Sequence, residues 1–154
     1  MPYLLPAFKA VSIIFAVSAV ATGVRAIVDP VGFTKSFGIP IDTTAATQPP
    51  PRDASAQIAT SQAGVNLRSS HELSKAYVSL MGVRQLGTGL TLLLFAYQQK
   101  WRESATILST IGLVVAGTDG YYLTRFGAPG LGRFHAIPGA LIAVLAGVVL
   151  YADL

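Results

Sequence analysis

The stretch that decides the fold is YVSLMGVRQLGTGLTLLLFAY, residues 77–97, in which Arg84 is the one charged residue. These 21 residues are enough to cross the hydrocarbon core of a bilayer, which takes about 20. A second run of this kind, ATILSTIGLVVAGTDGYYL at 105–123, contains the single acid Asp119. A charge at membrane depth costs about 2.5–3.5 kcal/mol on insertion scales. We therefore expect Arg84 and Asp119 to have a partner or a task.

The composition of the whole chain also favours a membrane protein. Of 154 residues, 52% are hydrophobic and only 12% are charged, and the mean hydropathy is +0.56. Soluble domains are about 25% charged. The net charge of +4 is not gathered into a dense basic run, so nucleic acid is not an expected partner. The absence of cysteine excludes disulfides, thiol catalysis and thiolate metal sites.

Four apolar segments are candidates for membrane spans: 6–28, 77–97, 105–123 and 135–151. The first has an apolar core longer than the 7–15 residues of a typical signal peptide, so we expect it to be a retained span. The fourth is short, and its Pro138 is compatible with a first helical turn.

The connections between the spans differ in length. The first, 29–76, is long: its part 42–62 has the polar, proline-rich composition of a mobile excursion, and its part 66–76 is compatible with an extended second helix. The other two, 98–104 and 124–134, are short, so neighbouring helices should be antiparallel. We predict an all-α, single-domain bundle of four transmembrane helices. The balance of Lys and Arg favours the cytoplasm for the first and third connections.

Antiparallel spans bring the polar residues into one half of the bundle. Arg84 lies about 10 Å from the start of its span, and Asp119 about 6 Å from the end of its own, on the same side. His135 begins the fourth span on that side, and Asp29 follows the first. We expect a cavity open to one membrane face, in which Arg84 orients Asp119, Asp119 acts as base, and His135 or Asp29 acts as acid. Further substrate contacts are expected from Arg25, Glu72, Tyr77, Gln85 and Tyr122.

Each of these residues also has a purely structural interpretation. Arg84 and Asp119 would then be an ion pair that joins two helices, and His135 a residue that begins a helix at the interface. His71 and Glu72 would be solvated in a polar loop. Two histidines without a carboxylate cluster do not make a typical metal site, so we expect neither metal nor cofactor. The expected partners are a lipophilic small molecule and membrane lipids, and the glycine-rich spans allow a homodimer.

Several motifs resemble a known family. They are FGIP at 37–40, GVRQLGTG at 82–89, GTD at 117–119 and HAIPGA at 135–140. Together they resemble a family of small four-helix integral membrane proteins, largely of unknown function and common in filamentous fungi. The resemblance covers nearly the whole chain except the insert at 42–62. The membrane Arg, Asp and His of that family correspond to Arg84, Asp119 and His135.

The resemblance implies a class of activity. Proteins of this type are similar to membrane epoxide hydrolases that open polyepoxides to build cyclic ethers in aurovertin- or citreoviridin-like polyketide pathways. It therefore implies a cofactor-independent acid–base enzyme for a lipophilic natural-product intermediate. We expect the protein to lie in the endoplasmic reticulum membrane. The alternatives are an isomerase or pericyclic cyclase of the same pathways, and a non-catalytic ligand-binding or scaffold protein of the membrane.

Overall fold

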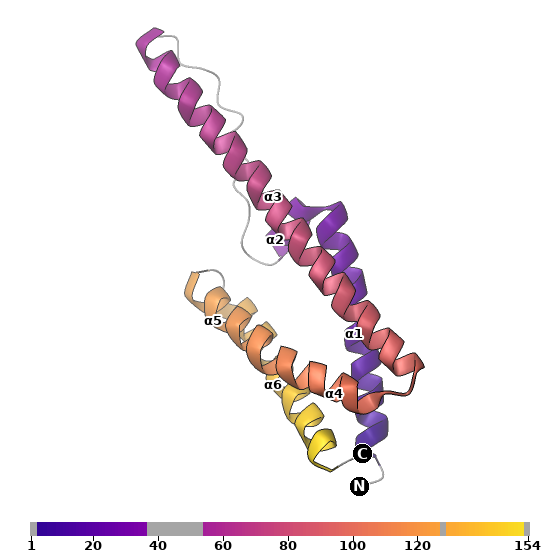
Figure 1. Cartoon of the computed structure of the whole chain (residues 1–154). Coiled ribbons are helices and arrows are strands. Elements are labelled where there is room, and N and C mark those ends of the chain that lie inside the picture. The colour runs from indigo at the N-terminus through magenta and orange to yellow at the C-terminus, as the bar shows by residue number, and fades with distance from the viewer. Residues whose placement is uncertain (1–2, 37–53, 127–128, 153–154) are drawn as a thin grey trace.

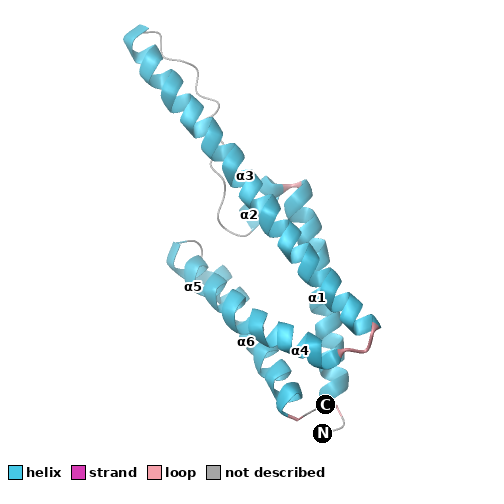
Figure 2. Ribbon diagram, in the orientation of Figure 1, coloured by secondary structure: helices cyan, strands magenta, loops and turns pink. Residues whose placement is uncertain are grey.

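The computed structural model describes residues 3–36, 54–126 and 129–152. In this part of the chain every element is a helix (Figure 2), which confirms the predicted all-α class there. The elements are α1 (Leu4–Val28), α2 (Pro30–Ser36), α3 (Ala54–Tyr97), α4 (Trp101–Thr110), the π-helical segment η2 (Ile111–Val115), α5 (Ala116–Phe126) and α6 (Pro129–Tyr151).

The helices form two packed sets that meet at one end (Figure 1). In one set α1 lies along α3, and in the other α4, η2 and α5 lie along α6. The sets share a buried apolar cluster, to which α1, α3, α4 and α6 contribute Phe8, Leu92, Leu108 and Val149 respectively. Both termini lie at this end, together with the α3–α4 turn. Among the described residues, α5 packs on neither α1 nor α3.

Glycine allows the close helix approaches within each set. A Cβ atom on Gly23 of α1 would lie 2.6 Å from the backbone nitrogen of Leu86, and one on Gly89 of α3 would lie 2.7 Å from the carbonyl oxygen of Ala16. In the second set Gly112 of η2 faces the backbone of Gly139 in α6. Small residues of this kind let helices in a membrane approach closely, since packing rather than water drives their association.

Three helical segments are long and apolar enough to cross a membrane: Leu4–Val28, His71–Tyr97 and Gly132–Tyr151. They correspond to the first, second and fourth predicted spans. The third predicted span, 105–123, is helical but is divided among α4, η2 and α5. None of these three elements alone reaches the roughly 20 residues that a crossing needs.

Helices occupy more of the predicted connections than the sequence suggested. Pro30–Ser36 forms α2, and residues 54–76 are helical as the first part of α3, which extends beyond the other helices (Figure 1). Residues 37–53, which include the FGIP motif and much of the predicted excursion, lie outside the described residues. The predicted position of Pro138 in a first turn is wrong, because α6 begins at Pro129 and Pro138 lies inside it. A proline at a helix start has no N–H to leave unsatisfied, which suits Pro129 to this place.

Candidate functional site

Two of the predicted catalytic residues lie on neighbouring helices where α5 packs on α6. Gly120, next to Asp119, is so close to α6 that a Cβ atom on it would lie 2.6 Å from the Cβ of Ala136, next to His135. The carboxylate of Asp119 is near enough to the imidazole of His135 to interact with it electrostatically. Both residues are partly buried, and the Nε2 atom of His135 is shielded from solvent. The structure thus brings two titratable side chains near each other within the second helix set.

Arg84 lies elsewhere, and the predicted ion pair with Asp119 is not formed in the described part of the chain. α3 packs on α1 through Gly82 and Gly89. Arg84 follows Gly82 by two residues, which places it about 200° around the helix at 3.6 residues per turn. Its side chain is exposed on the face opposite α1. The packing of α3 on α1 therefore turns Arg84 away from the neighbours in its own chain.

Asp29 is a helix cap rather than a neighbour of Asp119. Its Oδ1 atom accepts a hydrogen bond of 2.9 Å from the backbone N–H of Gly32, in the first turn of α2. Neither α1 nor α2 packs on α5, so the predicted role of Asp29 as a second acid beside Asp119 has no support in this arrangement. Arg25 is exposed in the last turn of α1.

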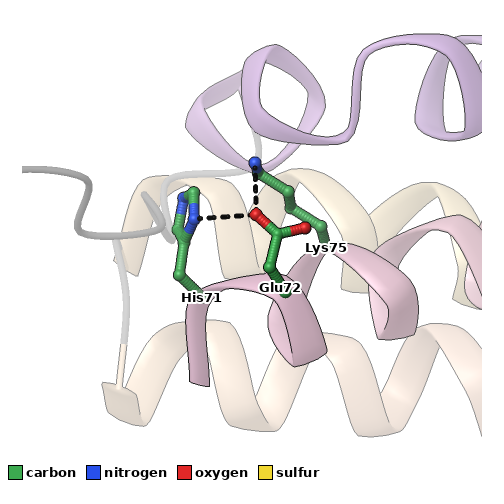
Figure 3. A network of polar contacts seen from close by, with 3 residues as sticks. All are labelled: His71, Glu72 and Lys75. Carbon is green, nitrogen blue, oxygen red and sulfur yellow. Dashed lines mark hydrogen bonds and ion pairs between the residues drawn. The ribbon is translucent and has the colours of Figure 1, made fainter. Parts of the chain in front are cut away.

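Glu72 takes part in a local network on α3 (Figure 3). Its Oε1 atom accepts a hydrogen bond of 3.1 Å from Nζ of Lys75 and lies 3.7 Å from Nδ1 of His71. The side chain of His71 is only 16% exposed, so the expectation of a solvated histidine in a loop is wrong. Sequence reasoning did not single out Lys75, although its spacing of three from Glu72 would have indicated an ion pair on a helix.

The other predicted substrate-binding residues are exposed and do not converge. Tyr77 and Gln85 lie on α3, and Tyr122 lies on α5. The ring of Tyr122 meets that of Tyr121 edge to face, with centroids 5.3 Å apart and an interplanar angle of 84°. Of this group only Tyr122 shares a helix with Asp119, three residues away and therefore near it on the helix surface.

The α3–α4 turn is held by contacts that sequence reasoning missed. Gln99 has a left-handed backbone with φ of 59°, uncommon for a residue other than glycine. Its side chain accepts a hydrogen bond of 3.1 Å from Nε1 of Trp101 and donates one of 3.1 Å to the carbonyl oxygen of Ala96. The ammonium group of Lys9 lies 5.0 Å from the centre of a Trp101 ring, within the range of a cation–π interaction. These contacts join α1, α3 and α4 at the end where the two sets meet.

Among the described residues, no group of three or more His, Cys, Asp or Glu side chains is placed to hold a metal ion. No curated protein and no solved structure matches the chain. One family model matches residues 16–149, which is most of the chain and includes α5 and its contact with α6. The chain therefore belongs to the family described as domain of unknown function DUF4267.

Proposed function

We propose that this protein is a membrane enzyme in which Asp119 and His135 carry out acid–base chemistry on a lipophilic substrate. The observation that supports this most is the contact between α5 and α6, which brings Asp119 and His135 close enough for their side chains to interact electrostatically. A carboxylate and an imidazole within reach of each other are the usual parts of a general acid–base pair. Ionisable residues within a membrane region are expensive to keep, which makes a functional role the default expectation.

In this proposal α4, η2 and α5 together supply a fourth membrane crossing. They follow one another from Trp101 to Phe126, which is about 39 Å at 1.5 Å per residue. Helical π-segments occur frequently at functional sites, and η2 ends four residues before Asp119. The exposed side chains of η2 are apolar, as lipid contact requires: Leu113, Val114 and Val115.

Hydrolytic opening of an epoxide is the reaction we assign to this pair. The carboxylate of Asp119 takes a proton from water while the water oxygen bonds to an epoxide carbon. The carbon–oxygen bond of the ring breaks, and the oxygen that leaves takes a proton from protonated His135. The product is a vicinal diol. Transfer of the proton from Asp119 to His135 then restores both groups, and no cofactor is consumed. With a hydroxyl of the substrate in place of water, the same steps form a cyclic ether.

The resemblance to membrane epoxide hydrolases of fungal polyketide pathways supports this choice of reaction. It also suggests a natural-product intermediate as substrate and the endoplasmic reticulum as location. An isomerase or pericyclic cyclase would use the same two groups to polarise a carbonyl. A non-catalytic scaffold is the candidate from another class, and the extension of α3 beyond the other helices favours it, since it offers helix surface to a partner (Figure 1).

The proposal is tested with membranes that contain the protein, a lipophilic polyepoxide and water labelled with a heavy oxygen isotope. We expect label in a diol product, or an unlabelled cyclic ether, and a rate lower by about 10²–10⁴-fold for Asp119→Asn. Asp29→Asn is the control, because that residue caps α2 and should retain activity.

The outcomes separate the candidates. No product from the wild-type protein would eliminate epoxide opening. An Asp119→Asn protein that inserts normally and keeps its activity would show that Asp119 is not the base. If Asp119→Asn lowers only the expression level of the protein and not the activity per molecule, the result supports a non-catalytic scaffold protein.

A further inference from the structure

One face of α3 has no neighbour among the described residues. It lies opposite α1, and its residues recur every three or four positions, all of them exposed: Tyr77, Leu80, Arg84, Gly87, Thr91 and Leu94. A Cβ atom on Gly87 would meet nothing within 4 Å, whereas Gly82 and Gly89 of the same helix lie against α1. We call these six residues the outer face of α3. Lipid can cover the apolar residues of this face, but hydrocarbon is a poor solvent for the charge of Arg84.

Arg84 lies deep in the membrane-spanning part of α3. It is 13 residues, or about 20 Å, from Tyr97, and nine residues, or about 14 Å, from Lys75 of the polar network on α3. A charge at such a depth is expensive unless it has a partner. The guanidinium has five N–H donors, and among the described residues it makes no ion pair or hydrogen bond. A charge at this depth requires an anion from outside its own helix set.

We propose that a second copy of the chain supplies this anion, in a two-fold symmetric dimer in which Arg84 of each copy pairs with Asp119 of the other. The depths differ by about 7 Å when both are measured along the helices from the α3–α4 turn. Arg84 lies about 20 Å along α3 from that turn, and Asp119, 18 residues after Trp101, lies about 27 Å along α4, η2 and α5. An extended arginine side chain spans most of this difference. A two-fold axis along the membrane normal preserves depth, so both contacts form together.

The faces that carry the two charges are both open. Val115 at the end of η2 and Tyr122 on α5 are exposed. They lie four and three residues from Asp119, so they are its neighbours on the helix surface, and they are farther than Asp119 from the side that packs on α6. On α3, the side that faces the second helix set is marked by Leu92, which is buried in the shared cluster. Arg84 lies about 80° from Leu92 around the helix axis, so it points outward rather than toward α5 of its own chain.

The dimer rests on the proposed fourth crossing but not on the proposed reaction. Where that reaction holds, each site becomes composite, with Asp119 and His135 from one copy and Arg84 from the other. Arg84 would then hold Asp119 ionised, the role expected of it from the sequence. The test below measures assembly alone, so failure of the dimer and failure of the reaction are separate results.

Exchange of the two charges between differently tagged copies tests the proposal. Arg84→Asp alone sets like charges against each other in both contacts of a dimer, and so does Asp119→Arg alone. When the two variants are expressed together, both contacts are again complementary. We expect co-purification of tagged copies in lipid nanodiscs to fall about tenfold for each variant alone, or about 1.4 kcal/mol of association, and to recover in the mixture. Variants that dimerise alone, or a mixture that stays monomeric, would overturn the proposal.

Cysteine cross-linking gives an answer even if those charge variants do not fold. The chain has no cysteine of its own. Tyr77→Cys and Tyr122→Cys place thiols at similar depth. Tyr77 shares a helix face with Arg84, and Tyr122 is a surface neighbour of Asp119. When the two variants are on separate chains, we expect them to form a disulfide-linked dimer. The control is Ser79→Cys with Tyr122→Cys, since Ser79 is partly exposed at similar depth but lies about 200° from Tyr77 around the helix. Equal cross-linking of the test pair and the control pair would contradict the dimer. A chain that carries both Tyr77→Cys and Tyr122→Cys and forms a disulfide only within itself would also contradict it.

Discussion

Individual acidic residues in this chain are held in three different ways. The carboxylate of Asp29 accepts a backbone N–H at the start of α2. That of Glu72 is bound by the ammonium group of Lys75, one helical turn away. That of Asp119 interacts electrostatically with the imidazole of His135 on another helix. Only the last joins titratable groups from separate helices, which is why the proposed chemistry is assigned there.

Substitution of Asp29 tests its role as a cap. Asp29→Ala should lower the free energy of unfolding by about 0.5–2 kcal/mol, because the N–H of Gly32 loses its acceptor. Asp29→Asn keeps an acceptor oxygen and should lose much less. Thermal unfolding of the purified protein in detergent measures both. Equal losses for the two variants would show that the hydrogen bond contributes little.

At the scale of helices, the fold depends on where glycine lies. Seven of the glycines whose surroundings are described sit against another helix: Gly23, Gly82, Gly89, Gly112, Gly120, Gly132 and Gly139. Each allows backbones to approach more closely than a Cβ atom would permit. The contacts of Gly112 and Gly120 with α6 bear on the candidate site, because Gly120 is next to Asp119 and lies against Ala136, which is next to His135.

Two glycines of α6 provide a matched test of this packing. A Cβ atom on Gly139 would collide with the Cβ of Ala116, and one on Gly147 would meet nothing within 4 Å. Gly139→Ala should therefore lower the free energy of unfolding by about 1–3 kcal/mol through overpacking. Gly147→Ala should raise it by about 0.5–1 kcal/mol, because alanine is the better helix former. The sign of each change can be read from unfolding in detergent, and a stabilised Gly139→Ala would contradict the close approach.

At the scale of the whole molecule, two helix sets meet at one end and share an apolar cluster there. The two termini and the α3–α4 turn lie at that end (Figure 1). The proposal of four crossings accounts for this arrangement, since an even number of crossings returns the chain to the side from which it started. Three crossings would leave the termini on opposite sides.

Labelling of single cysteines from one side of the membrane tests the number of crossings. Tyr3→Cys and Lys100→Cys should react with an impermeant maleimide on one side, and Lys35→Cys and Arg133→Cys on the other. This pattern follows if α4, η2 and α5 cross the membrane between Lys100 and Arg133. Sealed vesicles of known orientation give the measurement. Labelling of Arg133→Cys from the same side as Lys100→Cys would eliminate the fourth crossing.

The sequence by itself determined that the chain is helical and suited to a membrane. Hydropathy is a local property, so runs such as 77–97 reveal their environment without any knowledge of their neighbours. The order of helices along the chain also sufficed to bring Asp119 near His135, because residues close to a short connection stay close when the helices fold back on each other. The lengths of the helices were harder to predict from the sequence: α6 begins at Pro129, six residues before the predicted span 135–151.

Only the tertiary structure decided where the charge of Arg84 points. The side of α3 that faces α1 is set by Gly82 and Gly89, which meet α1 residues more than fifty positions earlier in the chain. A pattern within α3 shows which residues share a face, but it does not say which face finds a neighbour. The same contact that stabilises α3 on α1 therefore separates Arg84 from Asp119 of its own chain, which is why the proposed partner of Arg84 comes from a second copy.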